Sequence, residues 1–150
     1  MPADDPIRGP PCGILRGRVS QENVQLVTHC FELFNRGERE AMLRYVDPGI
    51  ETNEGVELPG ATSYLGPEGV ATAYEHWARQ WDDFRMELTE VIDAGNDVVL
   101  VTRHHGTGRA SGAPVQTSVA YVFTVDDGKL IRLRIFNTKA QAMEAVGLQE

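Results

Sequence analysis

Three side chains in the middle and second half of the chain could carry acid–base chemistry: Glu54, His104 and Tyr121. Strand alternation should place Ile50, Thr52 and Glu54 on one face, and that face is expected to point inward because Ile50 should seek the core. A carboxylate on a cavity wall loses hydration, so its pKa rises and it becomes a usable base near neutral pH. The alternative is a glutamate at a strand end that reaches solvent.

His104 and His105 are neighbours on a predicted strand and should point to opposite faces. One metal ion could not easily bind both, and no third ligand stands at suitable spacing, so no metal site is predicted. His104 shares the inward face with Thr102, where it could orient a substrate or move a proton; a core histidine satisfied by a neighbour is the alternative. Tyr121 also faces inward, and its hydroxyl needs a partner, either a ligand oxygen or His104.

Aromatic residues gather in one predicted helix, at Tyr74, Trp77 and Trp81. They are expected to be helix core and part of an apolar pocket wall rather than a cofactor box. The glycine-rich run G-T-G-R-A-S-G at 106–112 lies between two strands and does not open a helix, so it indicates a hairpin loop and not a phosphate cradle. No cofactor is expected.

The order of elements indicates how these side chains are positioned. Apolar residues at helical spacing predict a helix from the N-cap Ser20 to Gly37 and two more over 38–46 and 67–83, with Pro67 at a first position. A short strand over 50–54 and a loop rich in Gly and Pro, up to Gly66, separate the second of these helices from the third.

From Phe84 onward the hydrophobic period is two, which predicts four strands and then a helix over 140–146. The strands are expected over 84–93, 97–106, 115–125 and 129–138. Helices followed by such a meander predict an α+β fold, a curved antiparallel sheet wrapped around N-terminal helices, with a pocket between the layers.

One domain is expected over 19–150, behind a disordered tail over 1–18 that is rich in Pro and Gly. Val19 could correspond to a GTG start codon, so Met1 and Val19 both stay open as the natural start. The net charge of −8 repels phosphate backbones and anionic lipid, which argues against a nucleic-acid partner. No apolar run is long enough for a membrane span. The N-terminal residues also lack the apolar segment of a signal peptide, so none is expected, and the expected location is the cytoplasm.

The outer face of the predicted sheet carries an apolar patch. Its members alternate away from the helical side: Val99, Val101, Ala120, Val122 and Phe136. A monomer would expose this patch, so a homodimer through the outer sheet face is predicted.

Several strings resemble the SnoaL-like branch of the nuclear-transport-factor-2-like superfamily over about residues 19–148. They are S-Q-E-N-V-Q-L-V, F-N-R-G-E-R-E-A, Y-L-G-P-E-G-V and V-D-D-G-K-L-I-R-L. The resemblance implies an α+β cone with an internal pocket, in many members a dimer. The superfamily includes polyketide cyclases, ketosteroid isomerases, limonene epoxide hydrolases and binding modules, so the fold does not decide the function.

The catalytic positions of these families correspond only in part. The Asp-Arg-Asp arrangement that the resemblance implies for limonene epoxide hydrolases falls at His104, Thr102 and Ile135, so that machinery is absent. Ile135 also stands at the catalytic Asp of the polyketide cyclases.

The catalytic positions of the ketosteroid isomerases correspond better. The resemblance implies that Glu54 stands at the position of their general base, and that Tyr121 and Cys30 stand at the positions of their two oxyanion-hole donors. The predicted function is a cofactor-independent acid–base enzyme, an isomerase, cyclase or hydrolase of a mostly apolar small molecule, with Glu54, Tyr121 and His104 as catalytic residues. The predicted substrate contacts are Thr52, Tyr74, Trp77, Trp81, Thr102, Ile135 and Cys30. The alternatives are a non-catalytic binding domain and a dimeric interaction module with a vestigial pocket.

Overall fold

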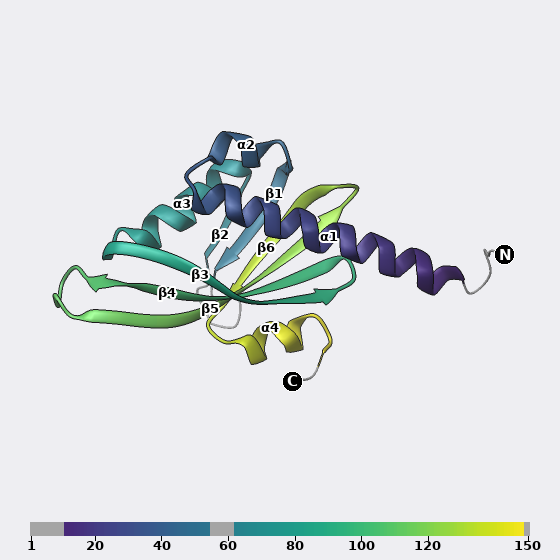
Figure 1. Cartoon of the computed structure of the whole chain (residues 1–150). Coiled ribbons are helices and arrows are strands. Elements are labelled where there is room, and N and C mark those ends of the chain that lie inside the picture. Colours follow the sequence, from purple (N-terminus) through teal and green to yellow (C-terminus); the bar gives the residue numbers. More distant parts are fainter. Residues whose placement is uncertain (1–10, 55–61, 149–150) are drawn as a thin grey trace.

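The computed structural model describes residues 11–54 and 62–148. Within these ranges the chain folds as one curved, open sheet of six strands with helices on both faces (Figure 1). The helices are α1 (Pro11–Asn35), α2 (Arg39–Leu43), α3 (Pro67–Ala78) and α4 (Lys139–Ala145). The strands are β1 (Val46–Glu54), β2 (Thr62–Leu65), β3 (Trp81–Ala94), β4 (Asp97–Gly108), β5 (Pro114–Asp126) and β6 (Lys129–Phe136). The predicted α+β class, a curved sheet with helices before it, is confirmed.

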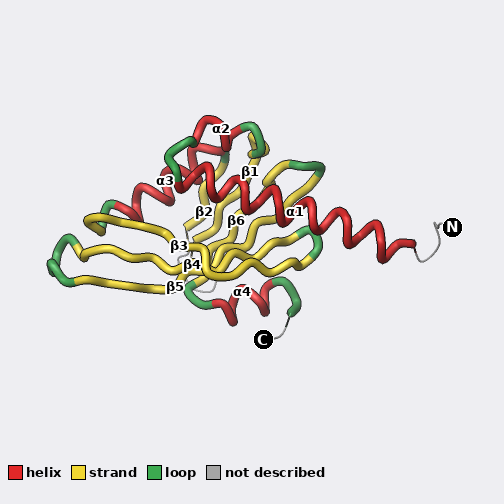
Figure 2. The backbone as a smooth tube through the Cα atoms, in the orientation of Figure 1, coloured by secondary structure: helices red, strands yellow, loops and turns green. Residues whose placement is uncertain are grey.

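The strands lie in the order β2-β1-β6-β5-β4-β3. Strands β3 to β6 form an antiparallel meander joined by the short turns seen in Figure 2, and β1 joins it beside β6 in parallel. The register shifts in β3 beside Arg85 and Glu90 and in β5 after Thr124. Such bulges increase the local twist and bend the sheet, which makes its inner face concave.

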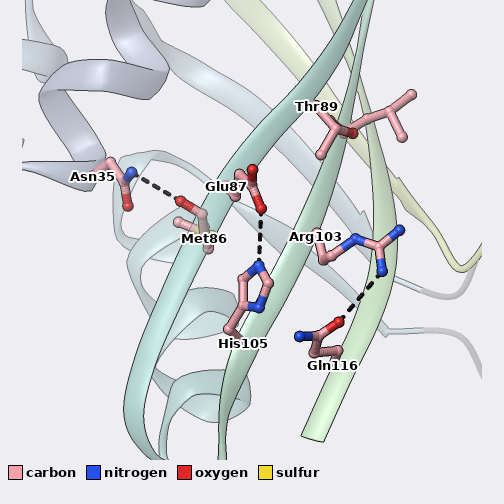
Figure 3. A network of polar contacts seen from close by, with 8 residues as sticks. Asn35, Met86, Glu87, Thr89, Arg103, His105 and Gln116 are labelled. Atoms are coloured by element: carbon pink, nitrogen blue, oxygen red, sulfur yellow. Dashed lines mark hydrogen bonds and ion pairs between the residues drawn. The ribbon is translucent and has the colours of Figure 1, made fainter.

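The main core lies between this concave face and α1. On α1, Val27 and Phe31 recur at helical spacing and are buried, while Val98 and Leu100 of β4 are fully buried opposite them. The helix ends at Asn35, and Gly37 just after it has a φ of +80°, a conformation that favours glycine. Asn35 also donates a hydrogen bond to the carbonyl oxygen of Met86, 3.1 Å away, which fixes this end of α1 against β3 (Figure 3).

A second core lies on the outer face, where α4 covers the sheet. The outward residues Val99, Ala120, Val122 and Phe136 are at most 3% exposed, because Ala142 and its neighbours in α4 pack on them. The prediction that a monomer would expose this patch is therefore wrong. The short terminal helix was expected from the sequence, but its docking place was not.

The rest of the outer face is polar. His105 pairs with Glu87 at 3.0 Å, and Arg103 nearby donates a hydrogen bond to Gln116 at 3.4 Å (Figure 3). His105 thus points away from the interior, whereas its neighbour His104 is fully buried. The predicted opposite orientation of the two histidines is confirmed.

Several boundaries differ from the sequence predictions. Helix α1 begins at Pro11, not at Ser20, and its N-terminal end reaches past the sheet (Figure 1). A proline is tolerated in a first helical turn, because its missing N–H would have no intrahelical acceptor there. Residues 1–10 of the predicted tail lie outside the described residues. None of the described helices is long and apolar enough to cross a membrane.

The region around α3 also differs. Strand β1 begins at Val46 and not at Ile50, and its pairing with β6 shifts in register between Val46 and Glu51. Strand β2 lies within the segment that was expected to be a loop. With four residues it is too short to show a clear alternation in the sequence. Residues 55–61 of that segment are outside the described ranges. Helix α3 ends at Ala78, so Trp81 opens β3 instead of closing the helix.

Candidate functional site

A cavity of about 320 Å³ lies between the helices and the concave face of the sheet. This volume is at the lower end of the range for small-molecule pockets, about 300–1,000 Å³. Most of its wall is apolar and comes from α1, α3 and the inward residues of β1, β5 and β6. Tyr74 and Trp77 add a hydroxyl and an indole N–H to this wall. Its other polar side chains are Glu54, His76, Gln80, His104, Tyr121 and Asn137.

Glu54 and Tyr121 face this cavity from either side of Ile135. Glu54 is in register with Ile135 on β6, and Ile135 is in register with Tyr121 on β5. Because neighbouring strands are about 4.8 Å apart, the backbones of Glu54 and Tyr121 are separated by roughly 10 Å. All three side chains line the cavity. A small molecule lying over Ile135 can therefore contact the carboxylate on one side and the phenol on the other.

Glu54 is half-buried at the end of β1. Loss of hydration raises the pKa of its carboxyl group, and the nearby His76 opposes part of this rise. A carboxylate with a raised pKa is a better proton acceptor, which is the property that a general base requires.

Tyr121 and His104 belong to a chain of hydrogen bonds that starts on α3. The indole Nε1 of Trp77 donates to Nδ1 of His104 at 2.8 Å, and Nε2 of His104 lies 3.2 Å from the hydroxyl oxygen of Tyr121. Burial, with a smaller contribution from His105, lowers the pKa of His104 to about 4. His104 is therefore neutral at pH 7. Burial also raises the pKa of Tyr121, so its phenol keeps its proton.

The other predicted contact residues divide into two groups. Tyr74, Trp77, Ile135 and Cys30 line the cavity, and burial raises the pKa of the Cys30 thiol to about 12, which makes it a poor nucleophile.

Thr52, Thr102 and Trp81 do not line the cavity. Both threonines are fully buried, and the hydroxyl of Thr102 donates to the carbonyl oxygen of Val119 at 2.8 Å. Trp81 packs against Trp77 and Phe84 behind the wall, because it belongs to β3 and not to α3. Sequence alternation places a residue on the inner face but does not say which neighbours cover it.

Three polar wall residues were missed from the sequence. His76 and Gln80 are exposed and lie on the helical side of the cavity, and Asn137 is exposed just after β6. His76 and Gln80 follow Ala73 by three and seven residues, and residues at this spacing share a helix face, so this pattern would have identified both. Among the described residues, no group of three or more His, Cys, Asp or Glu side chains is arranged to hold a metal ion.

The sequence matches one family model, and the fold is similar to that of several solved structures. The family model described as a SnoaL-like domain matches residues 27–133. The structure of an NTF2-like protein from Burkholderia thailandensis E264 is similar with a TM-score of 0.67 and 27% identity, over 82% of this chain and 95% of that one.

Two further structures share the fold. A protein named as a SnoaL-like polyketide cyclase from Jannaschia sp. CCS1 has a TM-score of 0.67 and 20% identity, over 88% of this chain and 96% of the other. TerC, crystallised with polyporic acid, has a TM-score of 0.65 and 19% identity, over 83% and 98%. A search of curated proteins found no match.

Proposed function

This chain belongs to the family of SnoaL-like domains, and on that premise we propose that its cavity binds a mostly apolar small molecule and performs acid–base chemistry on it. The reaction class is isomerisation, cyclisation or hydrolysis without a cofactor. The observation that carries the proposal is the placement of Glu54 and Tyr121 on one cavity wall, on either side of Ile135.

The proposed reaction begins when Glu54 removes a proton from a carbon next to a carbonyl group of the ligand. The electron pair of the broken C–H bond moves onto the carbonyl oxygen, and the hydroxyl of Tyr121 stabilises the developing negative charge by a hydrogen bond. Where a carbon–carbon double bond adjoins the deprotonated carbon, Glu54 returns the proton to the far end of that double bond, the double bond moves and the carbonyl re-forms, which completes an isomerisation. Where the ligand has a second carbonyl group, the enolate carbon attacks its carbon, and the alkoxide so formed takes the proton back from Glu54, which completes a cyclisation. Both routes leave the protein unchanged.

His104 has a supporting role in this proposal. Its lowered pKa and complete burial make it a poor proton donor at neutral pH, so it orients Tyr121 and does not protonate the ligand. Tyr74 and Trp77 contribute the apolar wall that keeps water from the reacting groups. The fold neighbour TerC, crystallised with polyporic acid, supports the use of this fold for a small organic molecule.

The test begins with native mass spectrometry of the purified protein, which identifies any small molecule that co-purifies and so suggests a substrate. The decisive variant is Glu54→Gln, which keeps the shape of the side chain and removes the base. We expect turnover to fall by about 10²–10⁴-fold while the ligand affinity stays nearly unchanged. Tyr121→Phe should cost about 10²–10³-fold, the usual loss for one oxyanion donor.

The matched control is Glu51→Gln on the same strand. Glu51 lies an odd number of residues from Glu54, so it faces the other side of the sheet, and it is absent from the cavity wall. Its variant should turn over at the parent rate. Parent-like turnover by Glu54→Gln would overturn the proposal. A protein that binds its ligand but never converts it would instead be a non-catalytic binding domain.

A further inference from the structure

The side chain of His104 is held from three elements at once. Trp77 of α3 contacts Nδ1, Tyr121 of β5 contacts Nε2, and Phe84 of β3 lies edge-on against the ring with centroids 5.2 Å apart. The imidazole is fully buried. Its two ring nitrogens therefore have fixed partners, and those partners determine where its proton resides.

The partners allow one arrangement of hydrogens. An indole N–H can donate but cannot accept, so Nδ1 of His104 must be the acceptor in its 2.8 Å contact with Trp77 and carries no proton. A neutral imidazole has one N–H, which must then be on Nε2. That N–H donates to the Tyr121 oxygen 3.2 Å away. The proton of the Tyr121 hydroxyl consequently cannot point back to His104.

The remaining direction for this proton leads toward the cavity. Besides His104, the hydroxyl of Tyr121 has one described contact, the sulfur of Met86 at 3.8 Å. A thioether sulfur is a weak acceptor. A ligand oxygen that replaced it would gain a strong donor in a largely apolar environment.

We propose that Trp77 is a positioning residue, which holds His104 in its Nε2–H form and so makes Tyr121 a donor that selects a ligand with a carbonyl oxygen over a ligand with an ammonium group. Only the choice of ligand rests on the proposed function. The proton position is a property of the free protein.

The charged and titratable surroundings agree with a neutral His104. The cavity wall brings Glu54 from β1 and His76 from α3 to the same space, Tyr121 approaches from β5, and the neighbouring His105 points to the other face. Among the described residues, neither nitrogen of His104 is hydrogen-bonded to a carboxylate that would stabilise an imidazolium. Reversing the proton position would leave the indole N–H of the half-buried Trp77 without its acceptor, which is unfavourable.

The first experiment is NMR of the free protein labelled with ¹⁵N, in which long-range ¹H–¹⁵N correlations report which imidazole nitrogens carry protons. The signals of His104 are assigned by their loss in His104→Gln. We expect a protonated Nε2 and a bare Nδ1, unchanged between pH 8 and pH 6. A proton on Nδ1, or on both nitrogens, in this pH range would overturn the inference.

The second experiment compares Trp77→Phe with Trp81→Phe. Both variants remove an indole from the same aromatic cluster, but only Trp77 donates to His104. The first should shift His104 toward the Nδ1–H form or a mixture, and the second should leave its spectrum unchanged. An unchanged spectrum in both variants would show that Trp77 does not set the proton position. If Trp77→Phe does not fold, the spectrum of the parent protein decides.

The third experiment uses two probes of similar shape, cyclohexanone and cyclohexylamine. Cyclohexanone should shift the signal of Nε2–H in His104, and Tyr121→Phe should weaken its binding about fivefold, the usual effect of one hydrogen bond. Cyclohexylamine is an ammonium ion at pH 7 that the carboxylate of Glu54 would attract, so the two probes are compared in Glu54→Gln, in which the amine should bind more weakly than the ketone. Equal or tighter binding of the amine, or unchanged ketone binding by Tyr121→Phe, would refute the ligand choice. These results do not depend on turnover, so they are separate from the test of Glu54.

Discussion

Lowering the pH from 6.5 to 4 should destabilise this protein through the single buried imidazole of His104. In the folded state burial lowers the pKa of His104 from 6.5 to about 4. One pKa unit corresponds to 1.36 kcal/mol, so the difference is worth about 3 kcal/mol in the free energy of unfolding. A loss of this size is a large fraction of the stability of an ordinary domain.

The direction of the effect follows from proton binding. Between pH 6.5 and 4 the unfolded chain binds a proton at His104 that the folded chain does not. The unfolded state therefore gains free energy as the pH falls, with a limiting slope of about 1.4 kcal/mol per pH unit. The contribution of His104 is fully present above pH 6.5, and it is lost as the pH falls to about 4.

The assay is urea denaturation at several pH values between 4 and 7, followed by the fluorescence of the two tryptophans. The parent is compared with His104→Gln, which removes the titrating group. Absolute stability will fall in this variant because two hydrogen bonds are altered, so the slopes against pH are compared. We expect the parent to lose about 3 kcal/mol more than the variant across the range.

The matched control is His105→Gln. This adjacent side chain lies on the outer face, pairs with Glu87 and contributes only the smaller part of the lowered pKa of His104, so the variant should keep most of the slope of the parent. Identical slopes for the parent and His104→Gln would refute the reasoning. So would an NMR titration in which His104 takes up its proton near pH 6.5.

Four further predictions concern other parts of the molecule. Gly106→Ala should destabilise by about 1–3 kcal/mol in urea titrations, because its Cβ would lie 2.8 Å from a ring carbon of Trp81. Native Cys30, with a pKa of about 12, should resist alkylation by iodoacetamide at pH 8 and react in urea, as measured by mass spectrometry of its peptide. Deletion of residues 1–18 should leave the melting temperature unchanged; a loss of several degrees would contradict this. We also propose a homodimer through the polar part of the outer sheet face, around Arg103 and His105. Light scattering should then give a mass of about twice 16.6 kDa, and a monomer would count against the proposal.

Local pattern was enough to predict the fold class and the faces of the main strands. A period of two along β4 places Val98, Leu100 and His104 on the inner face, because successive side chains of a strand alternate. The same rule predicted that Glu54 and Tyr121 would face inward, and both line the cavity. The helix starting at Pro67 was equally predictable, since proline in the first turn is a local signal.

Contacts between segments distant in sequence were decided only by the tertiary structure. The parallel pairing of β1 with β6 places Glu54 beside Ile135, and no local pattern specifies which strands become neighbours. The docking of α4 on the outer sheet converted an expected interface into core. The hydrogen bond from Trp77 to His104 joins α3 to β4, and the proton of the imidazole depends on it. Alternation determines the face of a residue, but the element that packs on that face determines its burial, its partners and its pKa.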